Sequence, residues 1–429
     1  MKKYFCFLAL AVCFLVSAAK FDIAITSTSK DGLVKKGEVV TVTAAPTLDG
    51  KAIPAGYTLS VEVWHDGGKR LLTKVPAEKG YTARLSLNMP GWAFAKFSLL
   101  DAKTGKTVRM SPRPYRGSGI FLAPEKMRPS RKVPKDFDAF WETNKKELAS
   151  VPMKVLEKKK VSINARADKT WVCYDMKIAC AGPKPVSGYL QIPLNKSRKY
   201  PVILEVAGAG VYDSYKSCHA NAIIFNINAH GILNGQPKSY YAGLQKKELK
   251  GYPHFGSGDR DKIYFKYMFL RVLRALEYLK TLPEWNGKDI IVRGSSQGGA
   301  QTIFAAAMDK DVTLASATVP AMVEYGAVLD TPRRRSGWPQ PYNTATAKKL
   351  AASWDYYDMA NFARKITCPI YISTGLIDVT CPPNGILGMY NVIPAQKKGM
   401  EIHRDMGHFG RNDIGKKAIA EALIKASGK

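Results

Sequence analysis

The sequence is poor in the residues that bind structural metals or close disulfide frameworks. Its 429 residues include seven cysteines and six histidines, with no CxxC pair and no Cys/His cluster at the spacing of metal ligands. If the N-terminal segment is removed, an odd number of cysteines remains, which excludes a fully paired framework. These cysteines are Cys173, Cys180, Cys218, Cys368 and Cys381. We expect no metal, no cofactor and no obligatory disulfide.

Acidic residues are also scarce, with 35 Asp and Glu against 65 Lys and Arg, which gives a net charge of +30. Such a charge can attract nucleic acid. The lysines are scattered along the chain, however, and no nucleic-acid-binding motif is present, so we expect no nucleic-acid partner. A solubilising basic surface and attraction to anionic glycans or a cell envelope both remain open explanations.

Long apolar runs are missing except at the N-terminus. There, two lysines precede an apolar run at residues 5–16, and the small residues Ser17-Ala18-Ala19 follow it. This order is typical of a signal peptide, and the run is shorter than the roughly 20 residues that span a bilayer. We predict a signal peptide at residues 1–19, a secreted or periplasmic protein, and no stable membrane insertion.

Residues 20–123 have the pattern of a small all-β domain. Short alternating runs are separated by Gly, Pro, Asp and Lys turns, and they cover residues 38–44, 58–64, 81–87 and 95–100. This pattern predicts an antiparallel, immunoglobulin-like β-sandwich. A stretch rich in proline and basic residues, from residue 123 to residue 134, is the expected linker.

Residues 124–429 have the pattern of an α/β domain. Strand-like runs such as residues 202–206 and 222–228 alternate with helical segments, of which the clearest covers residues 264–280. Such alternation indicates a mostly parallel sheet covered by helices. The length of the chain also favours two domains over one.

A candidate nucleophile lies between a strand and a helix. The apolar run at residues 289–293 leads into Gly294-Ser295-Ser296-Gln297-Gly298-Gly299, and an Ala-rich helical segment follows. This is the setting of a nucleophile elbow, in which glycines leave room for a strained serine beside a helix N-terminus. We predict Ser296 as the nucleophile, because Ser296, unlike Ser295, has glycines two residues away on both sides.

A serine nucleophile needs a base, and the base needs a group that orients it. In the chain order of this fold the acid follows the serine and the histidine comes last. Asp378 and His408 each follow a strand-like run, so both fall at the strand ends where α/β sheets place their sites. We predict Asp378 as the orienting acid and His408 as the base. The rival candidates are Asp405 for the acid and His230 for the base.

A developing oxyanion needs preorganised N–H donors. The first is expected from Gln297, the residue after the nucleophile. The second is expected from the loop after the strand at residues 201–206, where the small residues Ala207-Gly208-Ala209-Gly210 allow the backbone to approach closely. Within that loop we predict the N–H of Ala209.

From about residue 134 to residue 408, the chain resembles the acetyl xylan esterase and cephalosporin C deacetylase family of α/β-hydrolases. The matching segments are PKDFDAFW at 134–141, GYLQIP at 188–193, LRALEYL at 273–279, GSSQGG at 294–299, CP at 368–369, GLID at 375–378 and CPP at 381–383. Three segments depart from the family pattern. Residues 207–209 replace a His-Gly-Tyr loop, residues 228–231 replace an Arg-Gly-Gln signature, and Phe409 replaces the usual Glu after the catalytic histidine.

The resemblance implies removal of acetyl groups from sugar hydroxyls through an acyl-serine intermediate, with acetylated xylan or a similar carbohydrate as substrate. It also implies a ring-like homo-oligomer, an assembly that the extra N-terminal sandwich could block or alter. Two other functions remain open. One is a serine hydrolase of different selectivity, a peptidase or a non-carbohydrate esterase; the other is a glycan-binding protein with an inactive hydrolase domain.

Overall fold

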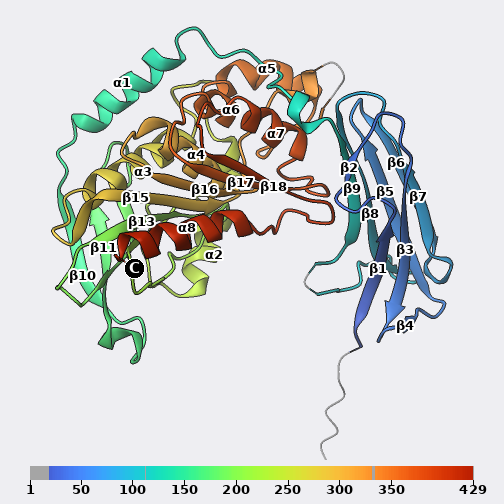
Figure 1. The fold of residues 1–429 in the computed structure, drawn as a ribbon, viewed down its shortest axis with the longest axis horizontal. Helices are drawn as coiled ribbons and strands as arrows, with labels where there is room; N and C mark the ends of the chain where they lie inside the picture. Colours follow the sequence, from blue (N-terminus) through green and yellow to red (C-terminus); the bar gives the residue numbers. More distant parts are fainter. Residues whose placement is uncertain (1–18, 112, 331–333, 429) are drawn as a thin grey trace, which may run out of the picture.

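The computed structural model describes residues 19–111, 113–330 and 334–428, which form a β-sandwich and an α/β part beside it (Figure 1). The predicted signal peptide lies outside the described residues, except for Ala19. Among the described residues, no helix has the length and apolar character needed to cross a membrane.

The sandwich consists of two sheets whose inward side chains share one core. One sheet contains β1 (Phe21–Ser27), β3 (Val40–Leu48), β4 (Lys51–Ala52) and β7 (Tyr81–Leu85). The other contains, in spatial order, β2 (Leu33–Val34), β9 (Arg116–Leu122), β8 (Gly91–Asp101), β5 (Tyr57–His65) and β6 (Lys69–Pro76). Alternate residues such as Val40 and Val42 of β3 and Leu59 and Val61 of β5 are buried in this core. The predicted antiparallel pairing holds except between β2 and β9, which are parallel.

The α/β part is built on a nine-stranded sheet. In spatial order the strands are β10 (Val155–Val161), β11 (Trp171–Ile178), β12 (Val186–Pro193), β14 (Ile223–Ile227), β13 (Tyr200–Val206), β15 (Trp285–Ser295), β16 (Leu314–Thr318), β17 (Ile370–Gly375) and β18 (Lys398–His403). From β14 to β18 all neighbours are parallel, whereas β10, β11 and β12 are joined by antiparallel pairing. The sheet is therefore mixed, and its antiparallel edge was not predicted.

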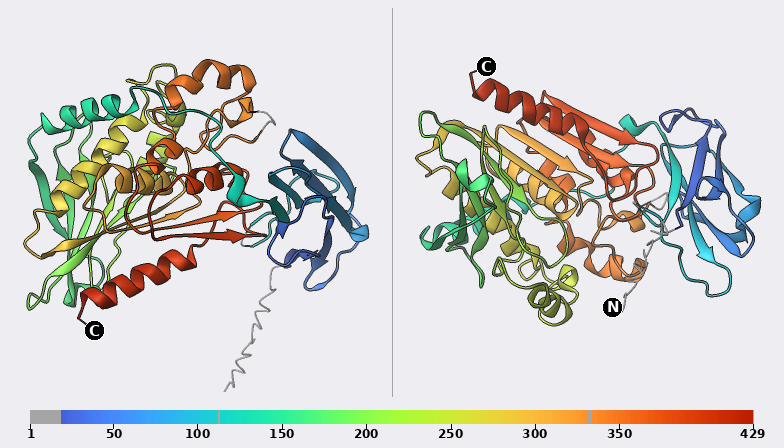
Figure 2. Two further views of the ribbon diagram at one scale, coloured as in Figure 1. Left: turned by 45° about the horizontal axis from the view of Figure 1, so that its top comes forward. Right: turned by 90° about the horizontal axis from the view of Figure 1, so that it is seen from below.

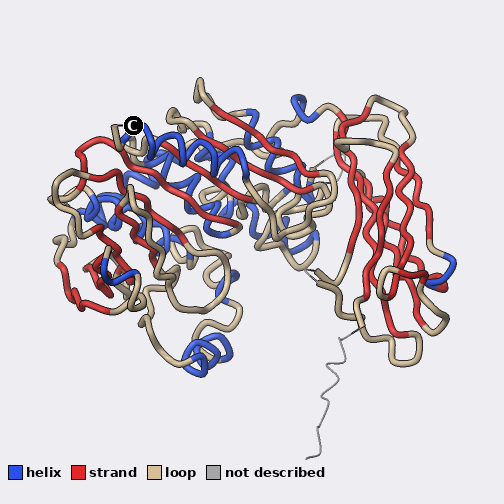
Figure 3. Tube along the Cα trace, turned by 60° about the horizontal axis from the view of Figure 1, so that its bottom comes forward, coloured by secondary structure: helices blue, strands red, loops and turns tan. Residues whose placement is uncertain are grey.

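Helices cover both faces of this sheet (Figures 1 and 3). They are α1 (Phe137–Ala149), α2 (Lys238–Lys246), α3 (Phe265–Leu279), α4 (Gln297–Met308), α5 (Thr344–Trp354), α6 (Met359–Ala363), α7 (Pro383–Asn391) and α8 (Asp413–Ala426). In β13, Val202 and Leu204 point into the large core with α3 and α4, whereas Ile203 points to the opposite face and packs with Leu423 of α8. A strand buried on both faces explains the continuous apolar run in the sequence.

The linker between the two parts is fixed to the α/β part by polar contacts. Arg131 forms a two-pronged ion pair with Asp355, at 2.6 and 2.7 Å, and the backbone N–H of Ser130 donates to the carboxylate of Glu324. Glu324 is only 2% exposed, and burial raises its pKa to about 8, an effect larger than the opposing attraction of nearby Arg334. Burial likewise raises the pKa of Asp358, whose carboxylate accepts from the Glu324 N–H, to about 7.

The raised pKa values of Glu324 and Asp358 predict that the stability of the fold decreases as pH rises. An acid whose pKa is raised in the folded state holds its proton there while the unfolded chain has lost it, so the free energy of unfolding decreases between about pH 4.5 and pH 8. Glu324→Gln should make the melting temperature less sensitive to pH across this window. Glu421→Gln, which changes an exposed glutamate of α8, is the matched control. An equal pH dependence of Tm in wild type and Glu324→Gln would contradict the assignment.

Candidate active site

Ser296 occupies a strained turn between β15 and α4. Its φ of 57° and ψ of −121° are rarely adopted by residues with a side chain. A Cβ on Gly294 would lie 2.6 Å from the Gly298 carbonyl oxygen, and a Cβ on Gly298 would lie 2.3 Å from the Val206 carbonyl oxygen. The tight turn therefore requires glycine at both positions, and Ser296 has the backbone geometry of a nucleophile elbow.

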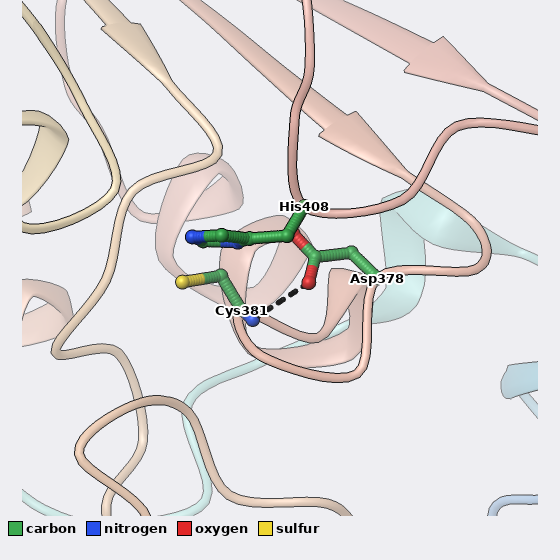
Figure 4. A group of neighbouring side chains, drawn as sticks. All are labelled: Asp378, Cys381 and His408. Carbon is green, nitrogen blue, oxygen red and sulfur yellow. Dashed lines mark hydrogen bonds and ion pairs between the residues drawn. The ribbon is translucent and has the colours of Figure 1, made fainter. Parts of the chain in front are cut away.

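The structure brings Ser296, His408 and Asp378 together from three loops. The His408 Nε2 atom lies 2.9 Å from the Ser296 Oγ atom, and the His408 Nδ1 atom lies 3.1 Å from the Asp378 Oδ2 atom. The Asp378 side chain is fully buried, and its other oxygen accepts the backbone N–H groups of Thr380 and Cys381 at 2.8 and 3.0 Å. Figure 4 shows Asp378 beside the His408 ring. With Nδ1–H donating to the aspartate, Nε2 is left to accept the serine proton.

Neither rival residue has this geometry. Asp405 is exposed and forms an ion pair with Arg404, 3.9 Å away. His230 is only 2% exposed, and burial lowers its pKa to about 4, so the ring is neutral. It donates from Nε2 to the Gly210 carbonyl oxygen at 2.9 Å and accepts from the Tyr264 hydroxyl at 2.8 Å. His230 therefore supports the backbone after β13.

The predicted oxyanion donors lie on adjoining segments. Gln297 is the first residue of α4, so its N–H has no acceptor within the helix. The loop after β13 lies against the same helix end, because the side chain of Gln297 donates to the Gly208 carbonyl oxygen at 3.2 Å and that of Gln301 donates to the Ala207 carbonyl oxygen at 2.8 Å. Ala209, the next residue along, is exposed. These bonds hold the loop that carries Ala209 against the end of α4 where the Gln297 N–H lies.

Two tyrosine hydroxyls also bind the loop after β13 and the Gln297 side chain that contacts it. Tyr252 donates to Gln297 Oε1 at 2.7 Å and accepts the Gly210 N–H at 3.3 Å, while Tyr212 donates to the Gly208 carbonyl oxygen at 2.9 Å. Burial raises the pKa of both phenols well above its usual range, so both remain protonated donors. These tyrosines were missed in the sequence, because nothing local to Tyr252 signals a contact with a turn 45 residues away.

One group of side chains among the described residues has the spacing of metal ligands, and it overlaps this site. Potential ligand atoms of Asp378, Cys381 and His408 lie within 4.8 Å of one another (Figure 4). Asp378 and His408 already hydrogen-bond to each other. Burial raises the pKa of the Cys381 thiol well above its usual range, which disfavours the thiolate that metals bind. The geometry thus suits proton transfer between Ser296 and His408.

Comparison with known proteins gives one consistent family. A model of the acetyl xylan esterase family matches residues 124–425. The acetyl esterase Axe7A of Xylanibacter ruminicola is 34% identical over 294 residues, an alignment that covers 66% of this chain and 65% of that protein. The chain thus spans just under two thirds of the length of that curated relative.

Two solved acetyl xylan esterase structures share the fold of the α/β part. The esterase from Paenibacillus sp. R4 superposes with a TM-score of 0.56, covering 70% of this chain and 98% of its own. The esterase from Thermoanaerobacterium sp. JW/SL YS485 gives a TM-score of 0.55, covering 70% of this chain and 96% of its own. Each is 21% identical to this chain, so the likeness is one of fold.

The site geometry predicts that Ser296 is selectively reactive. A fluorophosphonate should label the wild-type protein at Ser296, and His408→Ala should slow labelling by at least ~10³-fold because no base remains to take the serine proton. The measurement is the labelling rate by mass spectrometry of the tryptic peptide. Ser295→Ala is the matched control, since Ser295 is an exposed neighbour on the same turn, and it should label at the wild-type rate. Labelling that survives in Ser296→Ala would disprove the assignment.

Proposed function

The chain belongs to the acetyl xylan esterase family, and we propose that it is a serine esterase that removes O-acetyl groups from carbohydrates, xylan or xylo-oligosaccharides among them. The observation that carries the proposal is the hydrogen-bonded series from Ser296 Oγ through His408 to the buried Asp378, on a strained elbow. The family match over residues 124–425 supports the acetyl ester as the bond that is cleaved.

In the first half of the reaction, Ser296 attacks the acetyl carbonyl carbon while His408 Nε2 takes the serine proton. The resulting tetrahedral oxyanion is stabilised by the N–H groups of Gln297 and Ala209. Its collapse breaks the ester C–O bond, and His408 returns the proton to the departing sugar oxygen. The products of this half are the free sugar hydroxyl and an acetyl-serine.

In the second half, His408 takes a proton from water, which attacks the acetyl-serine carbonyl carbon. The second tetrahedral intermediate uses the same oxyanion donors and releases acetate as the proton returns to Ser296 Oγ. Throughout, Asp378 keeps Nδ1 protonated and favours the imidazolium that forms in each step. No cofactor is required by this sequence of bond changes.

Two further features belong to the proposal. The N-terminal pattern of two lysines, an apolar run and Ser17-Ala18-Ala19 supports export by a signal peptide to the periplasm or the exterior, where polysaccharides are met. The two facing sheets between Phe21 and Leu122 support assignment of the sandwich to the immunoglobulin-like class.

The function predicts a strong preference for short acyl groups. Wild type should hydrolyse p-nitrophenyl acetate faster than longer acyl esters and release acetate from acetylated xylan, and Ser296→Ala should lower both activities by at least ~10⁴-fold. The measurements are p-nitrophenolate absorbance and enzymatic acetate quantification. Activity on peptides instead of esters would favour a peptidase. An inert wild-type protein that still binds xylan would favour a glycan-binding role.

The side chain of Gln297 should matter separately from its backbone. Gln297→Met keeps the length of the side chain but removes its hydrogen bonds to Gly208 and Tyr252, so the loop after β13 loses its bond to the end of α4 at Gly208. We expect kcat on p-nitrophenyl acetate to fall by about 10-fold with KM nearly unchanged, because the bond to the oxyanion forms mainly in the transition state. Gln245→Met, on the exposed side of α2, is the control. A change in KM alone would contradict this role.

A further inference from the structure

The sandwich lies against the loops that carry Asp378 and His408 (Figure 2). Side chains from both parts form one buried apolar group, here called the interdomain cluster, and its members are Trp92, Phe94, Phe121, Met127, Leu376, Ile377 and Leu387. Leu376 and Ile377 immediately precede Asp378 in the loop after β17. The sandwich therefore contacts the loop after β17 that carries Asp378, here called the acid loop.

Trp92 makes the most direct contact with the acid loop. Its indole N–H donates to the Leu376 carbonyl oxygen at 2.7 Å, two residues before Asp378. Trp92 is fully buried, and its backbone N–H donates to the Asp66 side chain at 3.0 Å, which holds the Trp92 backbone within the sandwich. The sandwich backbone also comes close at Gly119, where a Cβ would lie 2.2 Å from the same carbonyl oxygen. The position of the acid loop is thus defined by residues of the sandwich.

A second set of contacts surrounds His408. The Tyr115 hydroxyl packs on Gly407 so closely that a Cβ there would lie 2.3 Å from the phenol oxygen. Burial raises the pKa of Tyr115; the charge of Arg113 lowers it, the Asp378 charge raises it, and the His408 backbone N–H lowers it. On the other side of His408, Arg113 donates to the Phe409 carbonyl oxygen. Residues before and after the histidine are therefore held by one segment of the sandwich.

We propose that Trp92 and Tyr115 are positioning residues, through which the sandwich sets the geometry of the Asp378–His408 pair. The proposal rests on the esterase function proposed above. Loops after strands are the mobile parts of an α/β fold, and a displacement of about 1 Å in a catalytic group can cost on the order of 10²-fold in rate. The sandwich is on this account part of the catalytic unit, and its contact with the α/β part is required for full turnover.

The first test uses the close contact between Tyr115 and Gly407. Gly407→Ala should displace the loop that carries His408 away from the Tyr115 phenol and lower kcat by about 10-fold. Adding Tyr115→Ala to this variant should restore part of the lost kcat, because it removes the group that clashes with the new methyl group. Tyr115→Phe alone should lower kcat, with KM nearly unchanged. The control is Tyr57→Phe, which changes a sandwich tyrosine packed on Phe21.

The second test concerns the indole N–H of Trp92. Trp92→Phe retains an aromatic ring and removes the buried bond to the Leu376 carbonyl oxygen. Trp171→Phe removes an exposed indole bond, 3.3 Å long, to the His219 carbonyl oxygen, in the antiparallel part of the sheet far along the strand order from β17. Turnover is measured per reactive serine, counted by fluorophosphonate titration, so that unfolded protein does not contribute. Tm is recorded for each variant. We expect a lower kcat per active serine for Trp92→Phe and no change for Trp171→Phe.

The outcomes separate the two proposals. If wild type hydrolyses acetyl esters and Ser296→Ala does not, the esterase function stands whatever the sandwich variants do. The positioning role is overturned if the wild type is an active esterase and two further results hold. These are that Tyr115→Phe and Trp92→Phe both keep the wild-type kcat per active serine, and that Tyr115→Ala does not restore the kcat lost in Gly407→Ala. A wild-type protein without esterase activity would reject the underlying function instead.

Discussion

The strained backbone of Ser296 is the constraint on which the rest of the site depends. A residue with a side chain at this φ and ψ costs about 1–3 kcal/mol. The cost is offset by hydrogen bonds that hold the turn: the Ser296 N–H donates to the Thr318 carbonyl oxygen, and its own carbonyl oxygen accepts from Ala300 and Ala321 at 3.0 Å. Because the turn lies between a central strand and a buried helix, the serine hydroxyl has a fixed position, and the other groups must be brought to it.

Parallel strands bring those groups to one edge of the sheet. The loops after β13, β17 and β18 carry Ala209, Asp378 and His408, and each loop has its own polar or apolar support. Tyr252 and His230 hold the first loop from the α/β part, and Trp92 and Tyr115 contact the other two from the sandwich. Phe409, which is 78% exposed, places an aromatic ring beside His408, with the ring centroids 5.9 Å apart.

Local signals in the sequence pointed to the three residues that the structure brings together at the site. Glycine spacing pointed to Ser296, and chain order after apolar strands pointed to Asp378 and His408, because each of these signals lies within a few residues. The antiparallel edge of the sheet was not predicted, since β10 is almost wholly exposed and has no apolar alternation. The interdomain cluster was not predicted either, because Trp92 and Leu376 are 284 residues apart and only the folded chain brings them together.

The most direct test of the central claim is to trap the covalent intermediate. Wild-type protein mixed with p-nitrophenyl acetate and quenched in acid within milliseconds should carry the mass of one acetyl group, located on the peptide that contains Ser296. Asp378→Asn should form this adduct far more slowly, by about 10⁴-fold, because the imidazole is no longer held in the productive tautomer. Turnover of the ester with no acetylated Ser296 peptide, or with the acetyl group on another residue, would contradict the account.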